Sequence, residues 1–310
     1  MTLPTIFIDG EAGTTGLDVL RQLEGRQDLK LILLGERRRD LEARREALNT
    51  ADAVILCLPD DAAKEAVAMI ETPRVRVIDA STAHRTAHDW TYGLAELDGG
   101  RQAERIRAST RISNPGCYPT GFIALMRPLV GEGLVPAGHP ISVNAVSGYS
   151  GGGKAMIAAF EDPAAPDATA DNFRLYGLKL QHKHVPEMQE HAGLSRPPLF
   201  VPSVGRFRQG MLVSVPLHLG ALPGRPSPET LHAALTAEYA DQPCVSVAPL
   251  EESSALAGLE PEALNGTNRM RLFVFGARGG EQALLVAQLD NLGKGASGAA
   301  VQNLELALGL

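Results

Sequence analysis

What the sequence lacks excludes several classes of protein. It has only three cysteines, and these are widely spaced, so they form neither a disulfide framework nor a zinc knuckle. Thiols of this kind fit a reducing compartment. The chain has 29 Lys and Arg residues against 36 Asp and Glu, and the net charge of -7 provides no broad basic field for a nucleic acid. No apolar run approaches the roughly 20 residues that a membrane-spanning helix needs.

Internal repeats and low-complexity linkers are missing from the sequence as well. Residues 1–4 lead directly into an expected strand, without a basic and then apolar leader, so we expect no signal peptide and a cytoplasmic protein. The 310 residues are 44% hydrophobic and 21% charged, which is ordinary for a globular enzyme. A chain of this length can bury a sizeable core and is expected to form two domains.

The segment around which the chain is organised is Ser113–Thr120, with the sequence SNPGCYPT. Its cysteine, Cys117, directly precedes an apolar run over residues 120–125 that is typical of a helix start. A thiol at a helix N-terminus lies in a positive field that favours the thiolate. Backbone N–H groups there have no partner within the helix and can stabilise a developing oxyanion. Cys117 is therefore predicted to be a covalent nucleophile in acyl transfer.

The N-terminal segment has the pattern of a dinucleotide-binding unit. A buried strand over residues 5–9 is followed by a glycine-rich segment, GEAGTTG, and by apolar residues at helical spacing over residues 17–23. Glycines let the backbone turn tightly and approach a pyrophosphate at the helix N-terminus. The spacing G-x-x-G-x-x-G is less common than G-x-G-x-x-G, so an ordinary glycine-rich turn is the alternative. The predicted cofactor ligands here are Gly10, Gly13, Thr14, Thr15 and Gly16.

The end of the second expected strand, residues 29–34, bears on the choice of cofactor. Glu36 lies about 20 residues after the last glycine, where an acidic residue would hold the ribose 2′-hydroxyl of NAD. Three arginines at residues 37–39 follow at once and favour the 2′-phosphate of NADP, because guanidinium groups bind phosphate bidentately. We expect NADP, with Arg37 and Arg38 as ligands. The alternative is that the arginines begin a charged surface helix over residues 38–48.

Two further strands continue the alternation of strands and helices. Residues 53–59 form a continuous apolar run, typical of a parallel sheet covered on both faces, with Cys57 in the core. The strand at residues 76–79 is followed by ASTAHR, at the strand end where ligands bind in open α/β sheets. There Ser81 is predicted to contact the cofactor. Arg85 is predicted to bind a substrate anion, with a plain surface residue as the alternative.

The alternation of strands and helices ends at residues 112–114, so we place the first domain boundary near Cys117. From Pro140 onwards the pattern changes to that of an α+β domain. Residues 141–146 alternate as a half-buried antiparallel strand does. The segment from Ser147 to Lys154 is too rich in glycine for a regular element and is predicted to be a loop closing over a ligand. Further strands are expected over residues 198–204, 211–218, 244–249, 269–275 and 282–289, with Cys244 in the core or at an edge.

The segment QHKHVPE contains the histidines best suited to chemistry, His182 and His184. Glu187 follows one helical turn later, on a helix expected over residues 186–191. The H-E-x-x-H spacing is missing and no second cysteine is near, which disfavours a metal site. Acid–base work for a distant cysteine nucleophile fits better. The remaining histidines are expected to be structural: His84, His88, His139, His191, His218 and His232.

Two other segments complete the set of candidates. Arg206 and Arg208 flank Phe207 and are candidate holders of a carboxylate or phosphate, with surface solubility as the alternative. The segment DNLGKGASG, residues 290–298, precedes an apolar helix expected over residues 299–308. A second glycine-rich turn opening a helix suggests that the chain returns to the first domain and completes the cofactor pocket.

Four of these segments resemble the short form of the N-acetyl-gamma-glutamyl-phosphate reductase family. They are Ile8–Gly16, Asn114–Thr120, His182–Glu187 and Asp290–Gly298, and the resemblance runs through the whole chain. The cysteine motif is the most specific of the four. Related semialdehyde dehydrogenases usually follow their cysteine with small polar residues rather than Tyr-Pro. The glycine loop differs from that of the longer family members.

The resemblance implies an α/β fold, in which a Rossmann-type parallel sheet domain is joined to an α+β glyceraldehyde-phosphate-dehydrogenase-like domain with a mainly antiparallel sheet. We expect the dinucleotide-binding domain over residues 1–116, completed by a C-terminal helix over 291–310. The catalytic, substrate and oligomerisation domain is expected over 117–290. NADPH, a small acyl-phosphate substrate and a homodimer or homotetramer are implied, without a metal, nucleic acid or membrane partner.

The resemblance also implies a mechanism. The Cys117 thiolate would attack the acyl phosphate of N-acetyl-glutamyl phosphate and expel phosphate, and hydride from NADPH would convert the thioester to the semialdehyde, a step of arginine biosynthesis. His184 matches the family's base, with Glu187 as its orienting group and His182 in reserve. The side chain of Asn114 and the backbone N–H of Cys117 are the expected oxyanion donors. The cysteine sulfur is expected to face the nicotinamide between the two domains.

The remaining assignments and the rival functions complete the prediction. Gly148 and Asn291 are expected near the nicotinamide, and Arg85, Arg208 and His182 at the substrate. One rival is a reductase of another acyl phosphate, such as aspartyl phosphate or an aminoadipyl analogue on a carrier protein. A cysteine hydrolase without hydride transfer is disfavoured by the glycine loop. A catalytically silent nucleotide-binding regulator is the third rival.

Overall fold

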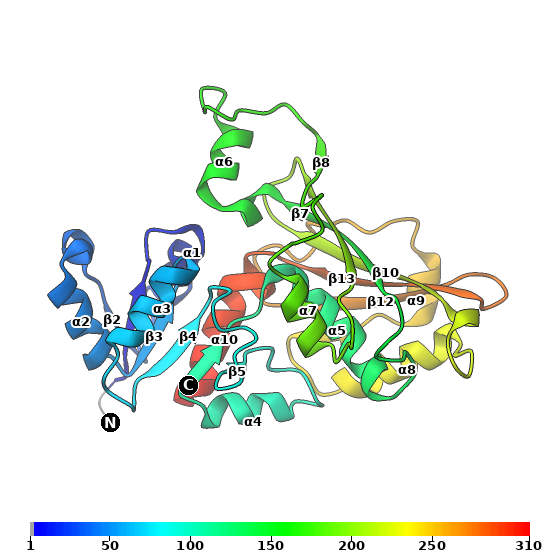
Figure 1. Ribbon diagram of the computed structural model, residues 1–310, viewed down its shortest axis with the longest axis horizontal. Coiled ribbons are helices and arrows are strands. Elements are labelled where there is room, and N and C mark those ends of the chain that lie inside the picture. Colours follow the sequence, from blue (N-terminus) through cyan, green and yellow to red (C-terminus); the bar gives the residue numbers. More distant parts are fainter. Residues whose placement is uncertain (1–2) are drawn as a thin grey trace. The chain divides into compact units, whose positions relative to one another are not determined.

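The computed structural model describes residues 3–310, except for the side chains of Arg38 and Arg39 (Figure 1). The chain divides into two compact units. The first unit contains the residues up to Ala95, then Arg101–Pro115 and Ala296–Leu310. The second unit contains Glu96–Gly100 and Gly116–Gly295.

The first unit is built on a six-stranded parallel sheet with the strand order β2-β1-β3-β4-β6-β5. Its strands are β1 (Thr5–Asp9), β2 (Lys30–Ile32), β3 (Ala53–Leu56), β4 (Arg76–Asp79), β5 (Thr91–Tyr92) and β6 (Arg111–Ser113). Its helices are α1 (Thr14–Leu23), the 3₁₀ helix η1 (Gly35–Arg39), α2 (Leu41–Thr50), α3 (Asp60–Met69), α4 (Arg101–Ala108) and α10 (Gly298–Leu308). This is the Rossmann-type arrangement expected from the sequence.

Both faces of this sheet are covered, because successive strand residues point to opposite sides. Ile6 and Ile8 of β1 belong to a core cluster with residues of α1, α4 and α10. Phe7, between them, belongs to a second cluster with residues of α2 and α3. All four residues of β3 are fully buried, which confirms the prediction drawn from its continuous apolar run. The C-terminal helix α10 is thus part of the first unit (Figure 1).

The second unit is built on a seven-stranded mixed sheet with the order β11-β12-β13-β10-β7-β9-β8. Its strands are β7 (Ser142–Gly148), β8 (Phe173–Leu175), β9 (Leu199–Gly205), β10 (Met211–His218), β11 (Val245–Val247), β12 (Met270–Gly276) and β13 (Gln282–Leu289). Only the pairs β11–β12 and β7–β9 are parallel, so the mainly antiparallel fold class is confirmed.

The helices of the second unit are arranged around α5 (Cys117–Gly131). Gly121 brings α5 against the sheet, because a Cβ at this position would lie 3.0 Å from Val213 of β10 and 3.1 Å from Ala287 of β13. The other helices are η2 (Tyr149–Gly152), α6 (Gly153–Glu161), α7 (Val185–His191), η3 (Leu219–Ala221), α8 (Pro228–Tyr239) and α9 (Leu250–Ala255). The π-helical turn η4 (Gly293–Ser297) leads from β13 to α10. Over residues 3–310, no helix is long and apolar enough to cross a membrane.

Two local expectations were wrong. Ser147–Lys154 is not an irregular loop: β7 continues through Gly148, and η2 and α6 follow directly. The glycine is needed there because its Cβ would lie 2.5 Å from the backbone of Arg208. The bounds of the charged helix considered as the alternative for the arginines, residues 38–48, were also wrong: α2 begins at Leu41, because Asp40 caps it by accepting hydrogen bonds from the N–H groups of the second and third residues of α2.

Candidate active site

Cys117 is the first residue of α5, as the motif predicted. Gly116 precedes it in an extended conformation, with φ of -76° and ψ of 151°. Because it is a glycine, it provides no side-chain cap for the helix. The Cys117 thiol is reduced and partly exposed. Amide groups of the first helical turn and the helix dipole both favour negative charge at this position. The arrangement suits a thiolate that attacks an acyl carbon.

Glu187 holds the start of this helix from a second element. It lies in the first turn of α7, is 1% exposed, and its Oε1 accepts a hydrogen bond of 2.8 Å from the Gly116 N–H. The carboxylate therefore ties α7 to the residue before the cysteine. An orienting contact from Glu187 to His184 stays a prediction.

The geometry of the two histidines separates their roles. His184 is buried, at 6% exposure, and its backbone N–H donates to Nδ1 of His182 over 3.1 Å. Nδ1 of His182 is an acceptor, so its proton is on Nε2 and the ring is neutral. Burial, aided by the charge of Lys183, lowers the pKa of His182 to about 4. His182 is thereby equipped to donate a hydrogen bond through Nε2, and it is poorly equipped to accept a proton.

Aromatic rings surround the two histidines within the second unit. Tyr118, next to the cysteine, lies 5.9 Å from the His184 ring and 6.2 Å from the His182 ring, centroid to centroid. Its hydroxyl donates to the Ser203 carbonyl over 3.0 Å and accepts from the Tyr176 hydroxyl over 3.0 Å. Burial raises the pKa of both tyrosines, and the charge of Cys117 adds to this rise. Both phenols therefore remain neutral donors beside the thiolate.

The turn that follows β13 is packed directly on the cysteine. A Cβ at Gly295 would lie 2.8 Å from Cβ of Cys117, so only glycine fits there. Asn291 accepts a hydrogen bond of 2.8 Å from the Gly210 N–H and donates one of 2.9 Å to Ser150 Oγ. Gly148 donates its N–H to the carbonyl of the same Gly210. The structure thus brings Gly148 and Asn291 together around Gly210, and their contact with a nicotinamide stays a prediction.

In the first unit, the glycines of the turn between β1 and α1 are packed closely against neighbouring backbone. Gly10 has φ of +92°, and its Cβ would lie 2.3 Å from the Cys57 carbonyl oxygen. A Cβ at Gly16 would lie 2.2 Å from the Gly10 carbonyl oxygen, whereas one at Gly13 would lie 3.3 Å from it. Thr14 and Thr15 open α1, and Gly13 before them offers no side-chain cap. The first amides of α1 are therefore available to an anion at the carboxyl end of β1.

The proposed ligands of a 2′-phosphate follow β2. Arg37 lies in η1 with a side chain that is 67% exposed, and its guanidinium is 3.6 Å from the Asp40 carboxylate. The side chain of Arg38, the other predicted ligand, lies outside the described part of the structure.

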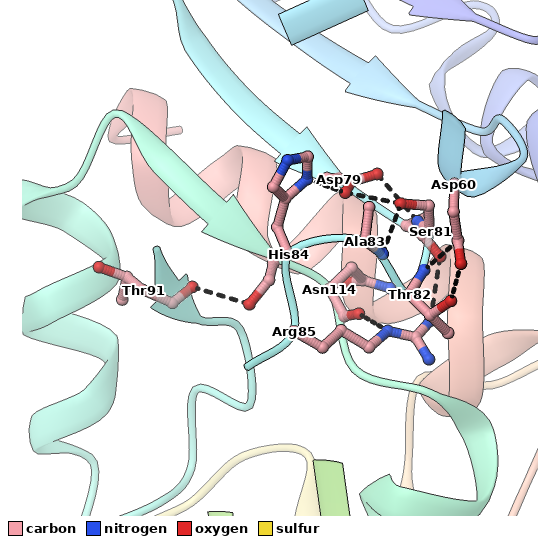
Figure 2. A network of polar contacts seen from close by, with 11 residues as sticks. Asp60, Asp79, Ser81, Thr82, Ala83, His84, Arg85, Thr91 and Asn114 are labelled. Carbon is pink, nitrogen blue, oxygen red and sulfur yellow. Dashed lines mark hydrogen bonds and ion pairs between the residues drawn. The ribbon is translucent and has the colours of Figure 1, made fainter. Parts of the chain in front are cut away.

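The residues after β4 form a buried polar network (Figure 2). Asp79 is fully buried and accepts hydrogen bonds from the Ser81 hydroxyl at 2.7 Å and from the Ser81 N–H at 2.9 Å. The His84 Nδ1 lies 2.6 Å from the same carboxylate, and the His84 ring stacks on Trp90. The Ser81 hydroxyl thus stabilises the turn in this structure, and its contact with a cofactor stays a prediction.

Arg85 and Asn114 meet in the same network. Arg85 is 7% exposed, so the alternative of a surface residue is wrong. Its Nε donates to the Asn114 carbonyl over 2.9 Å, and a terminal nitrogen donates to the Ala80 carbonyl over 3.0 Å. The Asn114 side chain donates to the Ala296 carbonyl and accepts from Asn303. This amide therefore links β6 to the start of α10, and its role as an oxyanion donor stays a prediction.

Arg208 and Arg206 stabilise the segment that follows η2. Arg208 forms an ion pair with Glu161 at the end of α6 and is 53% exposed. Arg206 lies over the Phe160 ring at 5.2 Å and donates to the Asp171 carbonyl over 3.0 Å. Substrate binding by Arg208 stays a prediction.

A buried ion pair was missed by the sequence analysis. Nζ of Lys294 lies 2.6 Å from Oε1 of Glu96, and each side chain is 1% exposed. The only sequence signal is a lone glutamate between buried apolar neighbours in Leu94–Leu97.

Among the residues that the structure describes, no cluster of three or more His, Cys, Asp and Glu side chains could hold a metal ion.

Comparisons with known proteins identify the domains of the chain. Residues 35–105 match the family model "Semialdehyde dehydrogenase, NAD binding domain", and residues 117–291 match "Semialdehyde dehydrogenase, dimerisation domain". The structure is similar to that of aspartate semialdehyde dehydrogenase II from Vibrio cholerae, with a TM-score of 0.74, 16% identity and 99% of each chain covered. It is also similar to that of aspartate semialdehyde dehydrogenase with NADP from Candida albicans, with a TM-score of 0.61, 13% identity and 98% of each chain covered.

Much more similar sequences carry a more specific name. The "N-acetyl-gamma-glutamyl-phosphate reductase 2" of Pseudomonas putida is 57% identical over 310 residues, covering 100% of this chain and 98% of the relative. The "N-acetyl-gamma-glutamyl-phosphate reductase" of Rhizobium leguminosarum bv. trifolii is 58% identical over 308 residues, covering 98% of this chain and 99% of the relative. The chain has a nicotinamide-cofactor domain and belongs to the N-acetyl-gamma-glutamyl-phosphate reductase family of semialdehyde dehydrogenases.

Proposed function

We propose that this chain reduces N-acetyl-gamma-glutamyl phosphate to N-acetyl-glutamate semialdehyde with NADPH, releasing inorganic phosphate, as a step of arginine biosynthesis. The observation that carries the proposal is the thiol of Cys117 at the start of α5, in a chain 57% identical to a relative with that name. The thiolate attacks the acyl carbon, the phosphate leaves with the bonding electrons, and a thioester forms on Cys117. The first amides of α5, with the Asn114 side chain, would receive the oxyanion.

The two histidines, His182 and His184, carry out the proton transfers and the hydrogen bonding to the substrate oxygen. His184 acts as the base that removes the thiol proton and returns a proton to the substrate oxygen. His182 donates a hydrogen bond from Nε2 to a substrate oxygen, because its Nδ1 already accepts the His184 N–H over 3.1 Å. Glu187 supports this chemistry by holding Gly116, and thus the start of the nucleophile's helix, in place. Arg85 and Arg208 would complete the binding of the anionic groups of the substrate.

The cofactor is proposed to be NADPH, and the glycine turn fits it. Side chains at Gly10 or Gly16 would clash with the backbone, so the glycines let the turn pack closely before the uncapped N-terminus of α1. The turn Gly10–Gly16 would hold the pyrophosphate, with Ser81 nearby. Arg37 and Arg38 would bind the 2′-phosphate, and Gly148 and Asn291 would lie near the nicotinamide. When bound, NADPH supplies the hydride that reduces the thioester.

The dimerisation-domain match and one open sheet face support a homodimer or homotetramer. Val213 and Ala287 face α5, so their neighbours Leu212 and Val286 point to the opposite face. An apolar groove lies on that face, lined by these two residues together with Asn144, Val201 and Phe275.

Large apolar side chains of the same groove remain exposed, which favours a second copy of the chain as the covering partner. Phe173 is 58% exposed, Leu175 48% and Leu284 40%. Leu284→Glu should lower the mass measured by light scattering. Leu41→Glu, at a 60% exposed position in the first unit, is the matched control and should leave the measured mass unchanged.

A cytoplasmic location stays a prediction.

The activity is tested by phosphate-dependent reduction of NADP with N-acetyl-glutamate semialdehyde and, separately, aspartate semialdehyde. Activity with the aspartate compound alone would sink the substrate assignment. Cys117→Ala should abolish turnover and leave NADPH binding, followed by fluorescence titration, nearly unchanged. Turnover by this variant would overturn the covalent mechanism, and a wild-type protein that binds no NADPH would point to a hydrolase.

A further inference from the structure

The buried pair of Lys294 and Glu96 has no role in the mechanism described above. Both side chains are 1% exposed, and both belong to the second unit. Removing two charges from water is unfavourable, and apolar residues of similar volume often replace such a pair without loss of stability. A fully buried pair is therefore more readily explained by the geometry that it imposes than by stability alone.

Lys294 lies in the π-helical turn Gly293–Ser297. Single π turns are rare and occur frequently at functional sites. The Gly295 N–H donates to the Asp290 carbonyl over 2.9 Å, which closes the wide turn. The Asp290 carboxylate in turn accepts from the N–H groups of Gly266 and Leu292. One end of the turn is thus fixed by Asp290, and its middle is fixed by Lys294.

The residue after Lys294, Gly295, is packed against Cys117. A Cβ at Gly295 would lie 2.8 Å from Cβ and 3.2 Å from Cα of Cys117, so the turn is in close contact with the cysteine backbone. Movement of the turn away from α5 would let the cysteine side chain rotate away from the helix N-terminus. The thiolate would then lose the field of the first-turn amides.

We propose that Lys294 and Glu96 are positioning residues, which hold Gly295 against Cys117 and thereby keep its sulfur at the N-terminus of α5. The inference rests on the proposed function in that it takes Cys117 as the nucleophile. The other groups around this end of α5 are Glu187, bonded to Gly116, the neutral phenols of Tyr118 and Tyr176, and the two histidines that precede α7, His182 and His184. Residue 96 belongs to none of these elements and lies in the segment Glu96–Gly100 of the same unit.

The test compares Glu96→Gln with Asp98→Asn. Asp98 lies in the same short segment and pairs with Arg127 of α5 at 2.8 Å, ten residues or about 15 Å along the helix from the cysteine. Alkylation of Cys117 by iodoacetamide is followed at that residue by peptide mass spectrometry across pH. Steady-state kcat and KM, and NADPH binding by fluorescence, are measured in parallel.

We expect Glu96→Gln to raise the midpoint pH of Cys117 alkylation by about half a unit or more. It should also lower kcat by about tenfold or more, with KM and NADPH affinity within about twofold of the wild type. Asp98→Asn should leave the alkylation midpoint and kcat unchanged. Wild-type alkylation and kcat in a folded Glu96→Gln variant would overturn the proposal.

If Glu96→Gln does not fold, the double variant Glu96→Leu with Lys294→Met replaces the pair by apolar side chains. It should fold and show the same two defects, and normal alkylation and turnover in it would equally overturn the proposal. Alkylation needs no substrate. A wild-type protein that lacks turnover of N-acetyl-glutamyl phosphate would therefore refute the proposed function, while the alkylation measurements would still decide the role of the pair.

Discussion

Two glycine-rich turns open helices in this chain, and their glycines are packed against different groups. In Gly10–Gly16, the glycines bring β1 and α1 close together and leave the first amides of α1 without a side-chain cap. In Gly293–Ser297, Gly293 is packed against the Thr267 carbonyl and Gly295 against Cys117, beside a buried lysine. The first turn packs backbone against backbone at an uncapped helix start, and the second packs against a reactive side chain. Similar composition can therefore serve different contacts.

The sharpest test of this comparison is Gly295→Ala. The new methyl group would lie 2.8 Å from Cβ of Cys117, so either the cysteine or the turn must move. We expect kcat to fall by about a hundredfold, because small displacements of reacting groups are costly. NADPH affinity should be retained, and fluorescence titration beside the turnover assay measures both. Near-normal turnover would show that the second turn is not part of the site.

The first turn is tested by Gly10→Ala and Gly16→Ala. Their methyl groups would lie 2.3 Å and 2.2 Å from backbone carbonyl oxygens, which cannot move freely. We expect each to lower the free energy of unfolding by about 2–3 kcal/mol, as overpacking does. Gly13→Ala, with its nearest contact at 3.3 Å, is the matched control and should cost less than about 1 kcal/mol. Chemical denaturation without cofactor measures these differences, and equal losses at all three positions would contradict the geometry.

The chemistry beside the second turn is tested by His182→Asn, which retains an acceptor for the His184 N–H but removes the Nε2 donor. We expect kcat/KM to fall by about tenfold with the acidic limb of its pH profile unchanged, because His184 is the proposed base. His182→Gln keeps a side-chain donor in place of Nε2 but loses the acceptor for the His184 N–H. Comparing the two variants separates the contribution of the donor from that of the acceptor. Loss of the acidic limb in His182→Asn would identify His182 as the base instead.

His182 also makes stability depend on pH. Burial lowers its pKa from 6.5 to about 4, so the unfolded chain binds a proton at a higher pH than the folded chain does. The contribution of His182 to stability is therefore present above pH 6.5 and is lost as pH falls towards 4. Unfolding curves of His182→Asn should lose less stability than the wild type across this interval. An identical decline in both proteins would contradict the neutral, buried state of this ring.

The smallest effect is expected at the edge of the first unit. Arg37 is exposed, so its contribution to binding a phosphate is screened by water and salt. Arg37→Ala should weaken NADPH binding about threefold to tenfold and leave NADH binding unchanged. Equal loss for both cofactors in fluorescence titrations would argue against a 2′-phosphate site.

Local pattern was enough to predict many of the strands and the helix start at Cys117. The strand at residues 282–289 and the start of a helix at Cys117 follow from hydrophobic periodicity and from the flanking Pro and Gly residues. The contact between Glu187 and Gly116 joins residues 71 positions apart, and that between Lys294 and Glu96 joins residues 198 positions apart. No local rule predicts such contacts, because they depend on how whole elements pack.

Glycine composition misled the prediction once, and for a physical reason. Residues 147–154 read as a loop because glycine is rare inside regular elements. In the structure, Gly148 ends β7, and a Cβ there would lie 2.5 Å from the backbone of Arg208 in the segment between β9 and β10, so the glycine permits this close approach. The burial of Arg85 could not be predicted either. Sequence alone does not show that a turn folds back over its guanidinium and buries it.

The packing of α5 has a consequence for the response to salt. Nearly every residue from Tyr118 to Leu129 is buried, and Gly121 brings the helix into contact with the sheet. Mobile ions are excluded from such surroundings, so the electric field along the helix passes through protein rather than electrolyte. Reactivity of the Cys117 thiol should therefore change less with ionic strength than that of a cysteine at the end of a surface helix.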